Sequence, residues 1–187
     1  MALVVKFMAN YFFAPKDYAD IPQRLDAADD AFLFNQGPAK GLGKIQFHDY
    51  SAAYDSYDFP NLTVFKEQIA LFREALVAAP ASKEQARDID FLLTTGELFT
   101  LVVYGQLILE NAKICDIPVE VLEQIFDFMV RDFSAFALEF HNKPSSTEAQ
   151  MDYARRMIRK PVTDETRYQK VWKEHVFATK GQYTMNP

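Results

Sequence analysis

Glu97 is the residue whose position in the sequence most resembles that of a catalytic carboxyl group. It lies in an apolar run that includes Leu93 and Leu98, and burial raises the pKa of a carboxyl group unless a cation or hydrogen-bond donors accompany it. A carboxyl group with a raised pKa can act as a general base, but a buried glutamate is usually paired. We expect Glu97 to have a structural partner, either Arg131 or a tyrosine hydroxyl, and not to be catalytic.

The residues with metal-binding or nucleophilic chemistry are scattered along the chain. The histidines are His48, His141 and His175, and none has a second His or a Cys at the spacing of a zinc site. Cys115 is the single cysteine, and it has no base near it in the sequence, so we expect a structural thiol. We therefore assign no catalytic residue and no metal ligand from the sequence.

Three aspartates, Asp26, Asp29 and Asp30, suggest a hard-cation site at first sight. They lack the ligand spacing and the glycine of a calcium-binding loop. We interpret them as a solvated acidic turn.

The glycine-rich stretch from Gly37 to Ile45 invites comparison with a phosphate-binding loop. A P-loop places a glycine five residues before the Gly-Lys pair and a Ser or Thr after the lysine. Here Gly37 precedes Gly43 by six residues, and Ile45 follows Lys44. The stretch from Gly41 also lacks the third glycine and the flanking strand of a dinucleotide fingerprint. We interpret the stretch as an irregular loop; the alternative is that its backbone contacts an anion presented by a partner.

Composition limits the classes of protein to which the chain can belong. It has 187 residues, a net charge of −6 and 17 phenylalanines, which is enough for one domain with a sizeable core built from large rings. The acidic balance argues against nucleic acid as a partner. A single cysteine cannot form an internal disulfide, which fits a reducing cytoplasm. The N-terminal apolar run is too short for a signal peptide, so we expect a cytoplasmic protein.

A long helix over about residues 83–113 organises the predicted fold. Ser82 and Gln85 have the spacing of a capping box at its start. Apolar residues cover every side of the helix between Phe91 and Leu109, which is typical of the centre of a bundle or of a membrane span. Glu97 in the middle of the run favours the bundle, because a carboxylate is costly in a bilayer. We predict a buried central helix and no membrane span.

Four further segments have apolar residues at helical spacing. The first should be an antiparallel neighbour of the long helix, because the turn between the two is short. The sequence thus predicts an all-α protein with an antiparallel helical bundle over residues 61–187. The four segments, each with its predicted start, are Asn61 to about Ala79 (cap Asn61), Pro118 to about His141, Ser145 to about Pro161 (capping box Ser145 and Glu148) and Thr163 to about Thr179 (cap Thr163).

Residues 1–60 form a poorly regular N-terminal third. Met1 to Phe13 has helical spacing, and an apolar helix that begins without a cap favours a chain cut in mid-domain over a complete small protein. Between Pro15 and Pro60 the periodicity is poor, apart from a short helix predicted around Leu25 to Phe34.

The aromatic residues of this third predict a contact surface. The segment Tyr50 to Phe59 adds three tyrosines and a phenylalanine to the apolar first helix. A soluble monomer rarely exposes a large apolar patch. We expect this surface to fold back onto the bundle or to be covered by self-association, and we predict a homo-oligomer with the contact at the first helix or at the segment Tyr50 to Phe59.

Several segments together carry a family resemblance. They are Gly96 to Ala112 (GELFTLVVYGQLILENA), Ile125 to Gln150 (IFDFMVRDFSAFALEFHNKPSSTEAQ) and Met157 to Pro161 (MIRKP), with Asp29 to Phe34, Gly37 to Gly43 and Phe47 to Asp49 upstream. These segments resemble the C-terminal region of large bacterial acyl-CoA dehydrogenases. That family binds FAD and oxidises the Cα–Cβ bond of a fatty acyl-CoA, with a glutamate that takes the α-proton and flavin N5 that takes the β-hydride.

The resemblance implies a helical C-terminal extension and not the catalytic core. The family's glutamate lies in an aromatic-Glu-Gly stretch that this sequence lacks, so no catalytic residue is transferred, Glu97 included. The first expected function is a non-catalytic domain that serves assembly or packing on an FAD-dependent core and carries no cofactor itself. The second is a free-standing α-helical interaction protein of shared ancestry. A third option is that the bundle binds an acyl chain between its Phe-rich helices.

Overall fold

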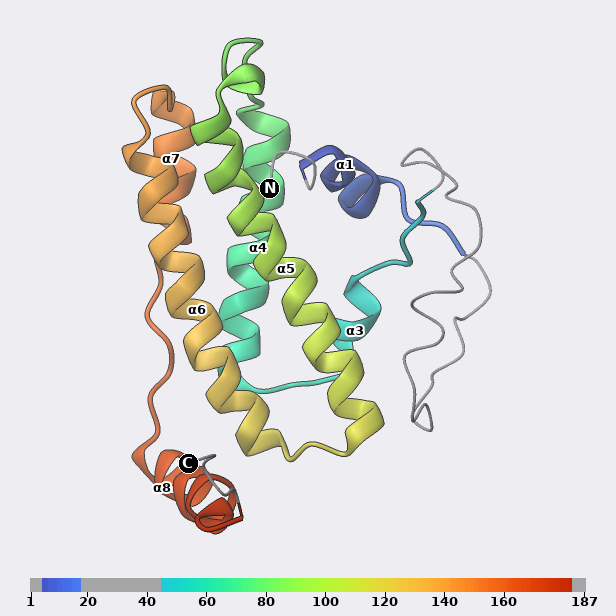
Figure 1. Cartoon of the computed structure of the whole chain (residues 1–187). Helices are drawn as coiled ribbons and strands as arrows, with labels where there is room; N and C mark the ends of the chain where they lie inside the picture. Colours follow the sequence, from blue (N-terminus) through green and yellow to red (C-terminus); the bar gives the residue numbers. More distant parts are fainter. Residues whose placement is uncertain (1–4, 18–44, 183–187) are drawn as a thin grey trace, which may run out of the picture.

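The computed structural model describes residues 5–17 and 45–182, and all regular elements of these residues are helices (Figure 1). Helices α4, α5, α6 and α7 alternate in direction, which confirms the predicted all-α antiparallel bundle around a long helix. The predicted short helix Leu25 to Phe34, most of the Gly37 to Ile45 stretch and the three aspartates lie outside the described residues. The helices are α1 (Val5–Phe13), α3 (Ser51–Asp55), α4 (Pro60–Ala78), α5 (Ile89–Cys115), α6 (Val119–Asn142), α7 (Glu148–Met157) and α8 (Glu165–Val171), with short turns η2 (Gln85–Arg87), η3 (Trp172–Val176) and η4 (Phe177–Thr179).

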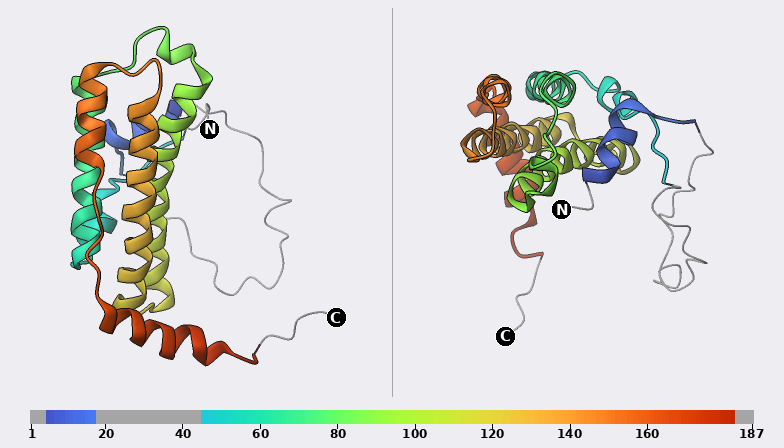
Figure 2. Two further views of the ribbon diagram at one scale, coloured as in Figure 1. Left: turned by 90° about the vertical axis from the view of Figure 1, so that its left-hand side faces the viewer. Right: turned by 90° about the horizontal axis from the view of Figure 1, so that it is seen from above.

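The bundle has two layers. Helices α5 and α6 pack along each other in one layer, and α4 and α7 pack along each other in the other. Both α4 and α7 also pack on α6, which joins the two layers. Helices α1 and α3 pack on α5 at the side of the bundle. After α7 an extended linker leads to α8, which lies across the foot of the bundle next to the start of α6 (Figure 2).

Large aromatic rings fill the core, as the phenylalanine content predicted. Phe65 of α4 meets the rings of Phe126 and Phe133 of α6 edge-on, with centroids 5.4 and 5.6 Å apart, a geometry that aromatic pairs favour. Phe12 of α1 reaches between α4 and α5, with ring centroids 6.0 Å from Phe72 and 5.7 Å from Phe99. Helices α4 and α5 run antiparallel and touch through side chains, since Phe65 of α4 lies against Gly105 of α5. Helix α6 packs closely on both of them.

The long helix begins later than the sequence predicted. The Ser82–Gln85 capping box forms, with the Ser82 N–H donating to Gln85 Oε1 at 2.9 Å and the Gln85 N–H donating to Ser82 Oγ at 3.2 Å. It caps only the single turn η2, because Asp88 then adopts an extended backbone. The Asp88 side chain accepts the N–H groups of Asp90 and Phe91 and starts α5 at Ile89.

Three other helix starts also differ from the predicted ones. Pro60 opens α4, and Asn61 is buried in its first turn instead of capping it. Thr147 forms the capping box of α7 with Gln150, two residues after the predicted Ser145 and Glu148. Asp164 and not Thr163 caps α8. The α-helix ends at Val171 and is followed by the π-helical turn η3, whereas the sequence predicted one helix to Thr179.

The N-terminal aromatic surface folds back onto the bundle. Tyr11, Phe12 and Tyr54 are buried, and Tyr54 belongs to α3, a helix that the sequence did not predict. The Tyr11 hydroxyl donates to Gln106 Oε1 at 2.5 Å, and the Tyr54 hydroxyl donates to the carbonyl oxygen of Val102 at 2.6 Å. These apolar residues, from which self-association was inferred, are thus covered within the chain.

Candidate functional site

Glu97 lies on α5 towards α6 and is half-buried. Its carboxyl group makes no hydrogen bond or ion pair within residues 5–17 and 45–182, and Arg131 instead pairs with Asp127 at 2.7 Å. Burial, and secondarily the like charge of Glu139, raises the pKa of Glu97. The predicted pairing of Glu97 with Arg131 or a tyrosine is therefore wrong. Lys143, the cation near Glu97, forms its ion pair with Asp90 instead.

His175 belongs to a cluster that the sequence did not reveal. Its ring, Glu174 and Glu120 of α6 bring ligand atoms within 4.8 Å of one another, and the His175 Nε2 atom has no hydrogen-bond partner in the described part of the chain. Lys170 forms an ion pair with Glu120, so a cation of the chain already neutralises this carboxylate. The remaining predicted candidates stay apart from it: Cys115 is exposed, and His141 bonds to its neighbour Asn142.

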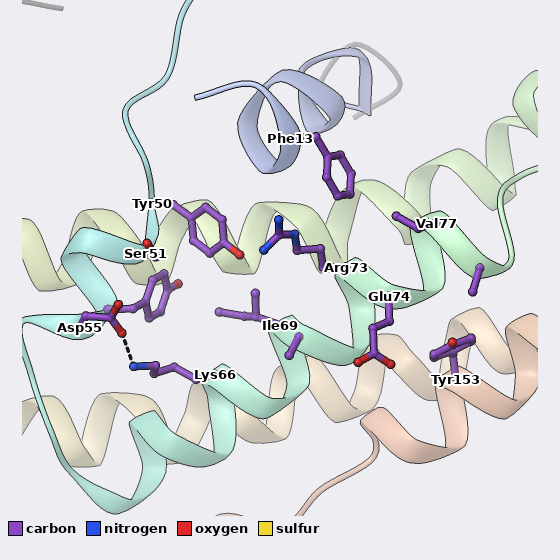
Figure 3. Close-up of a pocket in the computed structure, with 13 residues that line it drawn as sticks. Phe13, Tyr50, Ser51, Asp55, Lys66, Ile69, Arg73, Glu74, Val77 and Tyr153 are labelled. Carbon is purple, nitrogen blue, oxygen red and sulfur yellow. Dashed lines mark hydrogen bonds and ion pairs between the residues drawn. The ribbon is translucent and has the colours of Figure 1, made fainter. Parts of the chain in front are cut away.

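A groove of about 630 Å³ lies between α4 and the corner formed by α1 and α3 (Figure 3). Its floor is Ile69 and its neighbours on α4, and Tyr50 and Phe13 stand over it from the other side. A volume of this size is that of small-molecule sites, which are mostly apolar with a few polar groups. The groove is therefore a candidate binding site.

The charged residues of the groove differ in their partners. Lys66 forms an ion pair with Asp55, and Glu74 lies 3.8 Å from Arg156. Arg73 stacks over the Phe13 ring at 5.4 Å from its centroid. No carboxylate of the described residues lies within 4.0 Å of Arg73, so it is the groove's cation without an acidic partner.

The tyrosines of the groove are hydrogen-bonding groups and not bases. Burial raises the pKa of Tyr50, although the neighbouring Arg73 acts in the opposite direction. Burial raises the pKa of Tyr54 well above its ordinary value. Both hydroxyls are therefore protonated at neutral pH, and this arrangement suits binding rather than proton transfer.

A second hollow of about 220 Å³ lies beside the groove, on the other side of Phe13. Its wall is made by apolar side chains of α1, α4 and α5, among them Met8, Leu76 and Leu92. Sequence reasoning missed both hollows because they arise where α1 meets α4, and no spacing within one segment signals such a meeting.

The outer face is the name used here for the exposed apolar residues Leu93, Tyr104 and Leu107 of α5 and Phe128 of α6. Tyr104, Leu107 and Phe128 are 56%, 54% and 57% exposed. Arg131 lies over the Phe128 ring, 5.8 Å from its centroid, and Phe128 also lines a small hollow with Arg167 and Tyr168 of α8. The sequence predicted a buried central helix, whereas Leu93, Tyr104 and Leu107 of α5 are exposed among the residues that the structure describes.

Helix α5 also has the length and the mean hydropathy, 1.5, of a helix that crosses a membrane, and 44% of that apolar window is buried inside the bundle. A core helix passes the same test, so composition does not distinguish the two settings. The absence of a membrane span remains a prediction.

Comparison of the chain with protein-family models, with curated proteins and with solved structures finds no match.

Proposed function

We propose that this chain is a non-catalytic helical domain of an acyl-CoA dehydrogenase-like protein, where it packs on or helps to assemble an FAD-dependent core that oxidises fatty acyl-CoA. The observation that carries the proposal is the outer face. Its residues Tyr104, Leu107 and Phe128 lie in the two segments that resemble the family, Gly96 to Ala112 and Ile125 to Gln150. Exposed apolar patches with aromatic residues mark protein interfaces.

The chemistry of the groove supports a non-catalytic role. The Tyr50 and Tyr54 hydroxyls are held in their neutral form, and Lys66 is tied to Asp55. Glu97 does not line the groove. In this proposal FAD and acyl-CoA belong to the core, and the protein works in the cytoplasm.

The second candidate is a free-standing α-helical interaction protein that shares ancestry with that domain. It is favoured by the way α1 and α3 close the core of the described chain: Tyr11 and Tyr54 are 1% and 2% exposed. A piece whose N-terminal helix packs inside its own bundle does not need a second domain to cover that helix.

The test begins with the DNA upstream of the Met1 codon. We expect an open reading frame that continues in frame into a flavoprotein core. That core, tagged and co-expressed with this chain, should retain the wild-type chain on purification and lose a Tyr104→Glu/Leu107→Glu variant. Val77→Glu is the matched control, since Val77 is 67% exposed and lies in the groove, away from the outer face.

An in-frame stop codon directly upstream of Met1, with no flavoprotein core encoded there, would decide for the free-standing protein. Equal retention of the wild type and of the Tyr104→Glu/Leu107→Glu variant would reject the outer face as the contact with the core.

A further inference from the structure

The groove and the apolar hollow meet at one side chain. Phe13 lines both, and its ring is 46% exposed. Figure 3 shows it projecting from α1 over the groove, next to Arg73. Rotation of a half-exposed ring between rotamers is fast, so movement of Phe13 can connect the two spaces.

Arg73 provides an anion-binding group at this junction. Its neighbours Lys66 and Glu74 already have partners of opposite charge. Asp49 is close enough for Arg73 to contribute to its lowered pKa, although the Ser51 amide hydrogen bond is the main cause. A guanidinium group binds a carboxylate through two parallel hydrogen bonds. Arg73 is exposed, and its neighbour Tyr50, to which it hydrogen-bonds, is neutral and leaves the charge of Arg73 uncompensated.

The hollow behind Phe13 suits an apolar guest. Two polar side chains on its wall are already hydrogen-bonded: Thr95 Oγ1 donates to the carbonyl oxygen of Phe91 at 2.9 Å, and the Gln150 amide bonds to Gln85 and to the carbonyl oxygen of Ala79. A water molecule there would find few free partners, and apolar cavities of this kind take apolar ligands.

We propose that this junction binds an amphiphilic carboxylate with a linear chain, its carboxylate on Arg73 and its chain in the hollow behind Phe13. The ligand is a free acid and not an ester or thioester, because Arg73 needs an anionic end. The site lies between α1, α4 and α5, none of the outer-face residues lines it, and it does not depend on any flavoprotein core. It can therefore be tested on the purified chain alone.

The experiment is isothermal titration of the full chain with decanoate below its micelle-forming concentration. Decanol and decyltrimethylammonium provide the same chain with a neutral and a cationic head. Arg73→Gln removes the head-group contact, and Leu76→Trp fills the hollow. Arg87→Gln is the matched control, because Arg87 is an exposed arginine that lines neither space. Circular dichroism of each variant confirms that it is folded.

We expect saturable binding of decanoate that is weakened about tenfold to a hundredfold by Arg73→Gln, which is the usual size of a charge-assisted pair. Affinity should also rise about threefold to fourfold for each methylene added to a shorter acid until the hollow is full. Leu76→Trp should weaken binding, and Arg87→Gln should not.

Three results would overturn the proposal: no saturable binding of decanoate, equal binding of decanol and decanoate, or binding that neither Arg73→Gln nor Leu76→Trp weakens. Leu76 is half-buried, so if Leu76→Trp does not fold, Phe13→Ala takes its place. Phe13→Ala should change how the affinity depends on the chain length of the acid and should retain the preference for decanoate over decanol.

Discussion

Two buried carboxyl groups on adjacent turns of α6 decide where α8 is held. Glu123 and Asp127 are 4% and 2% exposed. Arg167 of α8 donates to Glu123 at 2.9 Å and lies 3.9 Å from Asp127. Burial raises the pKa of Glu123, while the Asn61 N–H and Arg167 act in the opposite direction. Because buried charges need partners, Arg167 attaches α8 to the foot of the bundle.

Asn61 makes a second attachment nearby, and its removal should be costly. Its side chain is buried, accepts the Val162 N–H at 2.7 Å and donates to the Val162 carbonyl at 3.2 Å. We expect Asn61→Ala to lower the free energy of unfolding by about 1–3 kcal/mol, because backbone groups of Val162 lose their partner. Urea denaturation measures the change. The exposed Asn111→Ala is the control, and equal stability of the two variants would contradict the account.

Glu97 should behave as an unpaired carboxyl group. Its pKa is raised above the ordinary 4.5, so the folded state binds the proton more tightly than the unfolded state does. The contribution of Glu97 to the free energy of unfolding is therefore complete below pH 4.5, where the carboxyl group is protonated, and is lost as the pH rises through the folded-state pKa. We expect Glu97→Gln to melt at or above the wild-type temperature at pH 7, with the difference vanishing near pH 4.

Glu139→Gln supplies the check on this explanation, since Glu139 is the like charge that adds to the raised pKa of Glu97. In that background the effect of Glu97→Gln at pH 7 should shrink. A lower melting temperature of Glu97→Gln at pH 7 would show a favourable ionic partner that the geometry lacks.

At the scale of elements, two capping motifs interlock at one end of the bundle. Gln85 of η2 and Gln150 of α7 exchange side-chain amide hydrogen bonds at 2.8 and 3.1 Å, and both are buried. Each also completes its own capping box, with Ser82 and Thr147 respectively. The connection between α4 and α5 is thereby joined to the one between α6 and α7.

Gly105 allows α3 to dock on α5. A Cβ atom at this position would lie 2.5 Å from the Tyr54 hydroxyl oxygen and 3.2 Å from Phe65. We expect Gly105→Ala to destabilise the protein by about 1–3 kcal/mol through overpacking, although alanine is the better helix former. Thermal and urea denaturation measure it. In a Tyr54→Phe background the penalty should be smaller, because the closest atom is gone; an unchanged penalty would contradict the explanation.

At the scale of the whole molecule, Tyr11, Phe12 and Tyr54 are buried within the described residues, whereas Tyr104, Leu107 and Phe128 of the outer face are exposed. We therefore expect the self-association contact at the outer face and not at the first helix or the segment Tyr50 to Phe59. A homo-oligomer remains a prediction, and so does the alternative that a catalytic core covers this face.

Light scattering on the purified chain tests self-association. We expect a dimer that buries about 2,000 Å² or more in total, and a monomer for the Tyr104→Glu/Leu107→Glu variant, because the added carboxylates would be desolvated at the contact. A monomeric wild type at high protein concentration would exclude the outer face as a self-association surface.

The isolated chain should be colourless and inactive as a dehydrogenase. The sequence has no flavin-binding or catalytic-base motif of the family it resembles. A visible spectrum and an acyl-CoA-dependent dye-reduction assay provide the measurement. A flavin band near-stoichiometric with protein, together with turnover, would contradict the proposed non-catalytic role.

Local patterns in the sequence were enough to predict the helices and the character of the core. Apolar spacing of three and four residues is a local property, so it predicted α1, α4 and α6 closely and α5 apart from its start, and the content of large rings predicted an aromatic core. The Ser82–Gln85 capping box was also predictable, because its two residues are three positions apart.

Which side of each helix is covered, and which distant groups meet, depends on how the whole chain packs. Asn61 binds Val162 across 101 positions, and Tyr11 binds Gln106 across 95. Apolar residues fall on every side of the helix around Glu97, yet α6 and α1 cover only part of that helix. Helical periodicity shows which residues share a face and not what that face will meet, because the second is set by the packing of all the helices together.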